Sequence, residues 1–192
     1  RNSKDVKVPQ ALACTKPGSP ELAKRICNSA NNASGGALGA SLFFDQGFVG
    51  WSLQTYKSQY GTVAEDEVTI GMKSDRAALE GAWRPTSGFF RSVNWQASQT
   101  RYQHTEFEGA EAGTVFANKG HDGRVQLRHK PWKTGAGTWE GVWGWQSEQA
   151  RFSADGAEAF APFSHSRTQA LFAIEEFSVG KLSLNLGVRR EQ

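Results

Sequence analysis

Residues 49–56 read Val-Gly-Trp-Ser-Leu-Gln-Thr-Tyr, so that apolar and polar side chains alternate. Successive side chains of a β-strand point to opposite faces, and such a stretch therefore has one apolar and one polar face. The same alternation recurs at 93–98 and 181–186. The sequence predicts an all-β protein built from antiparallel strands.

The composition leaves two environments open for such strands. Only 38% of the 192 residues are hydrophobic, and no run of about 18 apolar residues is present, which excludes a transmembrane helix. A transmembrane β-barrel remains possible, because half of each strand in such a barrel faces water. Seven Trp and 12 Phe are many for so polar a chain. The net charge of +3 is spread without a basic run, so no nucleic-acid partner is expected.

The alternation continues through much of the chain and predicts about eight strands. Their connections are expected to be short and long in turn, with short turns at one end of the sheet and longer polar loops such as 107–113 at the other. Outer-membrane barrels have short periplasmic turns and long extracellular loops. The expected strands are 37–45, 47–58, 67–84, 89–106, 114–130, 138–152, 166–176 and 181–191.

Residues 1–36 show no sustained alternation and are expected to form an extracellular loop, while 37–192 form the barrel strands. A short helix is predicted over 20–26, with Ser19 as its N-cap. Cys14 and Cys27 are the two cysteines of the chain, and they fit one disulfide in an oxidising compartment. The alternative is a pair of unlinked thiols.

Strand parity predicts which side chains face lipid. Alternate positions of each strand are mostly apolar, and Phe172 and Ile174 are counted among them. The positions between them are rich in Arg, Glu, Gln, Asn and Ser. So polar a second face is too costly for the core of a soluble sandwich and suits a water-filled lumen. A soluble sandwich would instead expose this parity to solvent. The tryptophans expected on the lipid face and in its aromatic girdle are Trp51, Trp83, Trp95, Trp139, Trp143 and Trp145.

Several short stretches together carry a family resemblance. They resemble, in their order and spacing, the barrel of TonB-dependent outer-membrane receptors. The stretches are 47–50, 102–109 (Tyr-Gln-His-Thr-Glu-Phe-Glu-Gly), 113–118 and 171–176. Within that family the chain is most similar to the zinc-uptake branch. The resemblance implies a location in the bacterial outer membrane and a receptor that takes up a metal ion, zinc above all, or a metal chelate.

The resemblance also implies a barrel of about 22 strands, closed by an N-terminal plug that contacts TonB. The sequence holds no match to the plug or to its TonB segment, so we expect an interior part of the barrel, strands four to eleven. The implied partners are the lipid of the outer membrane, the metal ion or chelate, and the TonB complex through the plug.

Metal-ligand residue types gather in one of the stretches that carry the resemblance. His104, Glu106 and Glu108 occupy positions i, i+2 and i+4 of a predicted strand and would point to its polar face. Imidazole nitrogen and carboxylate oxygen are competent zinc ligands. Glu111 and, more peripherally, His165 complete the candidate set. The plain alternative is a group of solvated side chains at a strand end, and zinc would be a transported ligand, with no catalytic cofactor expected.

An enzyme is not expected. The sequence has no Gly-x-Ser-x-Gly elbow, phosphate-binding loop or paired-cysteine metal motif. Asp155, Glu158 and His165 could imitate a catalytic cluster, but a long mobile loop with a few charges is the ordinary explanation. The alternative to a receptor is a self-contained eight-stranded outer-membrane barrel with a structural or adhesive role. That alternative predicts pairing of 182–189 with 38–44.

Overall fold

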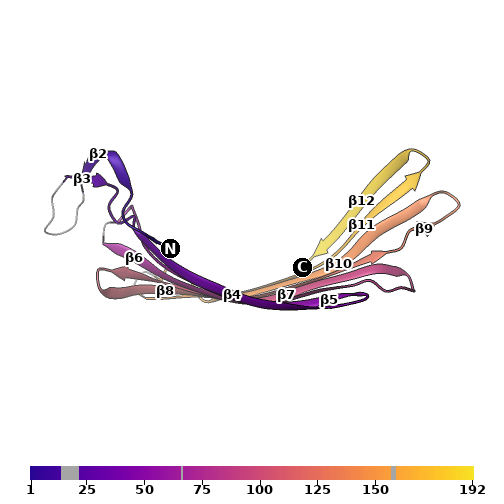
Figure 1. Ribbon diagram of the computed structural model, residues 1–192, viewed down its shortest axis with the longest axis horizontal. Helices are drawn as coiled ribbons and strands as arrows, with labels where there is room; N and C mark the ends of the chain where they lie inside the picture. Colours follow the sequence, from indigo (N-terminus) through magenta and orange to yellow (C-terminus); the bar gives the residue numbers. More distant parts are fainter. Residues whose placement is uncertain (14–21, 66, 157–158) are drawn as a thin grey trace.

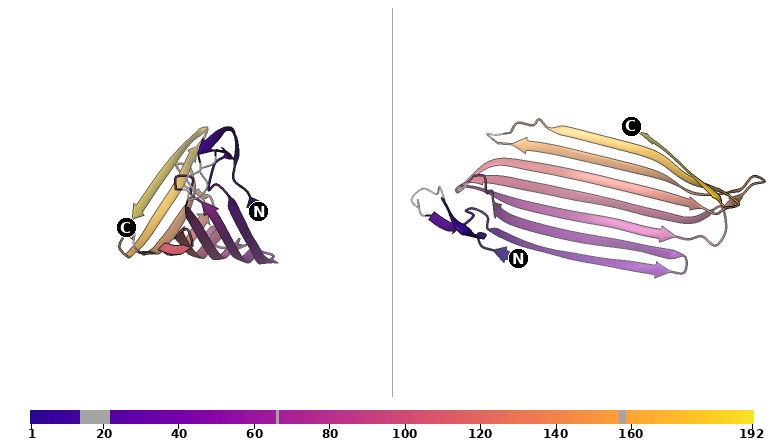
Figure 2. Two further views of the ribbon diagram at one scale, coloured as in Figure 1. Left: turned by 90° about the vertical axis from the view of Figure 1, so that its left-hand side faces the viewer. Right: turned by 90° about the horizontal axis from the view of Figure 1, so that it is seen from above.

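The structure, a computed structural model, describes residues 1–13, 22–65, 67–156 and 159–192. Its main feature is one antiparallel sheet in which strands adjacent in the sequence are also adjacent in space, curved into a trough (Figure 1 and Figure 2). The predicted all-β antiparallel class is confirmed. Within the described ranges, no helix has the length and apolar character needed to cross a membrane.

Eight long strands, as the alternation in the sequence predicted, and two short ones form this sheet. The long strands follow one another in simple up-and-down order, and each pairs with the next along most of its length. Their bounds are β4 Asn31–Phe44, β5 Gly47–Gly61, β6 Val68–Trp83, β7 Phe90–Glu108, β8 Glu111–His129, β10 Thr138–Asp155, β11 Ser164–Val179 and β12 Leu182–Glu191.

The sheet has two ends, named here after their first connections. The β4–β5 end carries the connections of β4–β5, β6–β7, β8–β10 and β11–β12, and the short strand β9 (Trp132–Lys133) pairs with β10 there. The β5–β6 end carries those of β5–β6, β7–β8 and β10–β11.

The predicted long loop over 107–113 is wrong. Phe107 and Glu108 continue the ladder opposite Ala112 and Glu111 after a bulge in β8, and this leaves a two-residue turn between β7 and β8. Gly109 adopts a positive φ of 60° in this turn, a conformation that favours glycine. Loop length therefore does not distinguish the two ends of the sheet.

The N-terminal region is more ordered than the sequence predicted. β1 (Asn2–Ser3) pairs with β4, and β2 (Lys7–Ala13) pairs with β3 (Leu22–Arg25) in a separate hairpin. The predicted helix is wrong over Leu22–Arg25, which is strand, and residues 14–21 lie outside the described residues. The loop predicted over residues 1–36 also extends too far along the chain, because β4 begins at Asn31. β5 extends to Gly61 and offers backbone partners to these polar residues whatever their side chains.

Asn28 holds the N-terminal region against the β5–β6 connection. Its side-chain amide nitrogen lies 3.0, 2.8 and 2.6 Å from the carbonyl oxygens of Thr62, Glu65 and Val68. Cys27, beside it, is buried with 8% of its surface exposed. Cys14 lies outside the described residues, so the disulfide between the two stays a prediction.

The sheet is open. Among the described residues, β12 pairs with β11 alone, and the outer side of β4 pairs only with the two residues of β1. The pairing of β12 with β4 that a self-contained eight-stranded barrel requires is therefore wrong. The described residues also lack a conventional core, because few apolar side chains are buried while large ones such as Leu38, Trp51 and Leu182 are 66%, 45% and 73% exposed. The buried apolar residues are Cys27, Ala82, Phe116 and Ala170.

Candidate functional site

The strand pairing places all six predicted tryptophans on one face of the sheet. Trp51 is the cross-strand partner of Leu79, Trp83 that of Val93, and Trp95 that of Val125. Such partners, described here as level with one another, lie on the same face of the sheet. Trp139, Trp143 and Trp145 have the same parity on β10. We call this side the tryptophan face. That it faces lipid stays a prediction.

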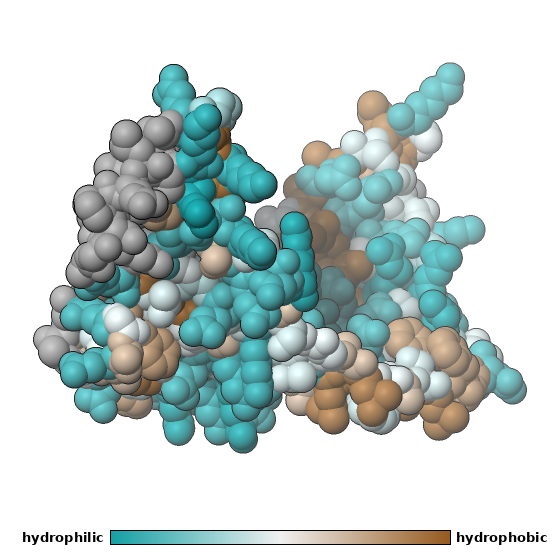
Figure 3. Space-filling view, turned by 60° about the vertical axis from the view of Figure 1, so that its left-hand side comes forward, coloured by the Kyte–Doolittle hydropathy of each residue, from teal (hydrophilic) through white to brown (hydrophobic). Residues whose placement is uncertain are grey.

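The tryptophan face is apolar over only part of its area. In the space-filling view, hydrophobic side chains gather mainly at the lower right of the molecule, whereas the nearer, left-hand part is mostly hydrophilic (Figure 3). The left-hand part belongs to the β5–β6 end, where the N-terminal hairpin also lies (Figure 1).

The opposite face is polar and charged. Arg91 and Arg128 both reach the Glu140 carboxylate, with N–O distances of 3.2 and 3.7 Å, and Ser98 donates a hydrogen bond to Asp122. Arg91 can point this way because a bulge in β7 separates it from the regular ladder. This arrangement agrees with a wet surface.

The prediction that Phe172 and Ile174 lie on the apolar face is wrong. Trp143 pairs with Ala173, so the even-numbered residues of β11 lie on the polar face, where the Arg124 guanidinium sits 5.1 Å from the centre of the Phe172 ring. Apolar residues of both parities follow one another in β11, and periodicity alone could not decide the register. A shift of one residue exchanges the faces of a whole strand.

His104, Glu106 and Glu108 share the polar face at the β5–β6 end, as their spacing predicted. The His104 ring stacks on Phe116, with 4.6 Å between ring centres and 21° between planes. Its Nδ1 is buried and has no hydrogen-bond partner among the described residues. The stacking therefore fixes the orientation of the ring, and its Nδ1 is a buried polar atom whose hydrogen-bonding capacity is unused among the described residues.

The five predicted metal ligands are not brought together into one site. Glu111 is level with Glu108 across the β7–β8 turn, but His165 lies on the tryptophan face, level with Arg151. Among the described residues, no group of three or more His, Cys, Asp or Glu side chains could hold a metal ion. The described residues thus offer part of a ligand set at most.

A second histidine cluster, which the sequence analysis missed, lies on the tryptophan face at the β4–β5 end. His129 is 2% exposed, its Nε2 lies 3.0 Å from Glu175 Oε2, and its Nδ1 lies 2.7 Å from the Lys130 carbonyl oxygen. Trp143 Nε1 donates to the other Glu175 oxygen at 2.6 Å, and Phe89 stacks on the imidazole at 5.3 Å. Both ring nitrogens of His129 face acceptors, an arrangement that suits the doubly protonated ring.

A glycine makes the cluster possible. His129 on β8 and Glu175 on β11 are separated by β10, where Gly141 stands level with Glu175. A Cβ at Gly141 would collide with the Glu175 carboxylate and with the Ile174 carbonyl oxygen. Gly141 lies beside Glu175 only through the pairing of β10 with β11, so the sequence alone carries no local signal for this cluster.

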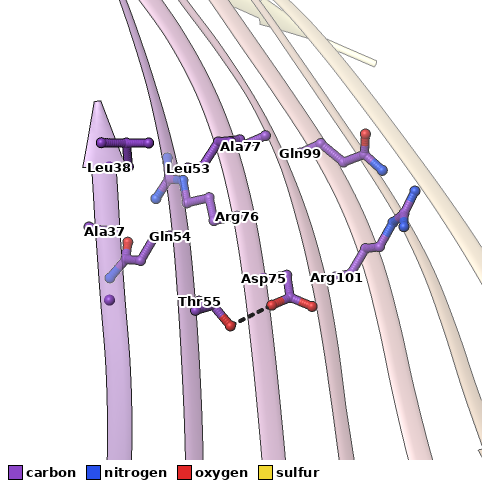
Figure 4. A pocket seen from close by; sticks show the side chains of 11 residues that line it. Ala37, Leu38, Leu53, Gln54, Thr55, Asp75, Arg76, Ala77, Gln99 and Arg101 are labelled. Atoms are coloured by element: carbon purple, nitrogen blue, oxygen red, sulfur yellow. Dashed lines mark hydrogen bonds between the residues drawn. The ribbon is translucent and has the colours of Figure 1, made fainter. Parts of the chain in front are cut away.

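A groove of about 600 Å³ crosses the tryptophan face of β4 to β7 at the edge of its apolar part. Leu38, Leu53 and Ala77 form one side, and the next row holds Thr55, Asp75 and Arg101 (Figure 4). Thr55 donates a hydrogen bond of 2.7 Å to Asp75. The groove therefore has one apolar and one charged side, which suits an amphiphilic ligand.

No protein-family model matches this chain. The described residues offer an exposed apolar band, a polar opposite face and a histidine, His104, with a buried ring nitrogen that lacks a partner among them.

Proposed function

We propose that this chain forms part of the wall of a transmembrane β-barrel in the bacterial outer membrane. The tryptophan face contacts lipid, and the polar face lines the path of a transported solute. The lack of a conventional core and the large exposed apolar side chains of the described residues support this, because a soluble sheet buries such side chains under a second layer.

The observation that carries the proposal is the path of the apolar band across the strands. On β4 the apolar side chains of the tryptophan face run from Leu38 to Phe44, and on β12 from Leu182 to Val188. Phe44 and Val188 nevertheless lie in one row of paired residues. That row is Phe44, Gly47, Trp83, Val93, Leu127, Trp143, Ala173 and Val188.

The band therefore climbs obliquely across the sheet. On β4 it extends from this row toward the β5–β6 end, and on β12 toward the β4–β5 end. From β4 to β12 the centre of the band moves by roughly 20 Å along the strand direction, while the sheet extends by roughly 34 Å across the strands. The band is therefore inclined by about 30° to the rows of paired residues. Strands of membrane barrels tilt by about 35–45°, and a flat lipid layer must cross tilted strands at such an angle.

A spin-label experiment on two adjacent residues tests the membrane assignment. Val125→Cys on the tryptophan face and Gln126→Cys on the polar face are compared in lipid vesicles, in a background in which Cys14 and Cys27 are serine. We expect the label at 125 to collide with oxygen and the label at 126 with a water-soluble nickel chelate. Equal access of the nickel chelate to both sites would refute the proposal.

We further propose that the barrel is that of a TonB-dependent receptor that takes up zinc or a zinc chelate. The support is the family resemblance together with His104, a polar-face residue that has an unpartnered Nδ1 among the described residues and shares its face with Glu106 two positions along β7. Other parts of the receptor would complete the zinc coordination. Restored growth of a zinc-starved strain by the intact gene, and its loss without TonB, is the expected result.

A further inference from the structure

The tryptophan face becomes strongly basic just beyond its apolar band. Arg101, Lys119 and Arg151 stand level with one another on the adjacent strands β7, β8 and β10. Adjacent strands are about 4.8 Å apart, so the three backbones span only about 10 Å. Lys57 and Lys73, paired on β5 and β6, lie in the next row toward the β5–β6 end. We call these five residues the basic patch.

The positive charge of the basic patch is largely uncompensated. Its acidic neighbour Asp75 is already held by Lys73 at 2.8 Å and by Thr55. Arg101, Lys119 and Arg151 are exposed and form no ion pair within the described ranges. On the polar face, by contrast, Arg91 and Arg128 share Glu140.

The patch is hollowed rather than flat. A surface groove of about 440 Å³ is lined by Lys73, Arg101, Lys119 and Arg151. Arg101 and Asp75 also line the apolar groove of Figure 4, which reaches Leu38 and Leu53. The charged groove and the apolar groove thus meet at Arg101 and at Asp75, whose carboxylate is held by Lys73, and a ligand with an anionic head and a hydrocarbon tail would fit both.

The position of the patch fits the headgroup layer of a membrane. Arg101 lies four residues beyond Ala97 of the apolar band, roughly 13 Å along a tilted strand. Long basic side chains at this level extend toward lipid headgroups while their methylene groups stay on apolar surface. Arginine and lysine also bind phosphate oxygens strongly.

We infer that the basic patch binds the phosphate groups of a membrane glycolipid, with one acyl chain in the groove lined by Leu38 and Leu53. This inference rests on the proposed membrane location of the tryptophan face. It adds a lipid-binding site to that location and is independent of the transported solute.

The test measures binding of a fluorescent bisphosphorylated glycolipid, lipid A, to the full chain in detergent micelles. Replacing Arg101, Lys119 and Arg151 together by glutamine removes three charges, and we expect affinity to fall roughly tenfold or more. Dephosphorylated lipid A should bind the unmodified chain more weakly by a similar factor. Excess inorganic phosphate should not displace the glycolipid, because the acyl groove contributes to binding.

The matched control removes the same charge from the other face through Arg124→Gln, Arg128→Gln and Arg189→Gln, three polar-face residues outside both grooves, and should leave the affinity within about twofold. Equal losses in both triple variants, no loss in the patch variant, or full displacement by inorganic phosphate would each overturn the inference. The spin-label comparison of residues 125 and 126 tests the membrane location independently of this lipid-binding site. A chain that inserts in the membrane but does not distinguish phosphorylated lipid refutes this site alone.

Discussion

His129 and His104 occupy opposite ends and opposite faces of the same sheet, and their surroundings differ in kind. His129 is 2% exposed and both of its ring nitrogens have partners, one of them the Glu175 carboxylate two strands away. His104 stacks on Phe116 but leaves its Nδ1 without a partner among the described residues. A fully partnered histidine ties strands together, whereas one with a free nitrogen can still bind a ligand.

The largest effect should come from removing the carboxylate that His129 needs. Glu175→Ala leaves a buried imidazole without its partner and also removes the acceptor of Trp143, so we expect about 3 kcal/mol less unfolding free energy. Urea unfolding in lipid vesicles measures it. Glu176→Ala is the control, because that exposed carboxylate accepts only from the serines Ser178 and Ser183 and should cost less than about 1 kcal/mol. Similar losses for both variants would argue against a special role of the cluster.

A smaller loss is expected when the gap between His129 and Glu175 is filled. Gly141→Ala places a Cβ against the Glu175 carboxylate and the Ile174 carbonyl oxygen, and should cost about 2 kcal/mol. A Cβ added at Gly187 meets no atom within 4 Å, so the control variant Gly187→Ala should change the unfolding free energy by less than about 0.5 kcal/mol. The same urea titration decides between them, and an unchanged Gly141→Ala protein would show that the strands can move apart freely.

The comparison becomes sharpest when each histidine is removed in turn and zinc binding is measured. His104→Ala should lower zinc affinity about tenfold while costing little stability, since its free nitrogen is the proposed ligand. His129→Ala should lower stability and leave zinc affinity unchanged. Isothermal titration with zinc, alongside unfolding, reads both quantities. Loss of zinc affinity in the His129 variant alone would reverse the assignment.

How far the sequence predicted the site can be judged from the same residues. Parity correctly placed His104, Glu106 and Glu108 on one face, because the face of a strand residue follows from counting along the chain. It placed Phe172 on the wrong face, because β11 is apolar on both parities and only the pairing of Trp143 with Ala173 sets its register. The Glu175 contact joins residues 46 apart and could not be read from local pattern.

The sequence by itself determined the class of this protein and its eight long strands, since alternation is a local property of each strand. Only the tertiary structure decided how those strands are aligned. The alignment sets the oblique course of the apolar band, the level arrangement of Arg101, Lys119 and Arg151, and the contact of His129 with Glu175. Each of these depends on register between strands, which backbone hydrogen bonds and cross-strand packing select together.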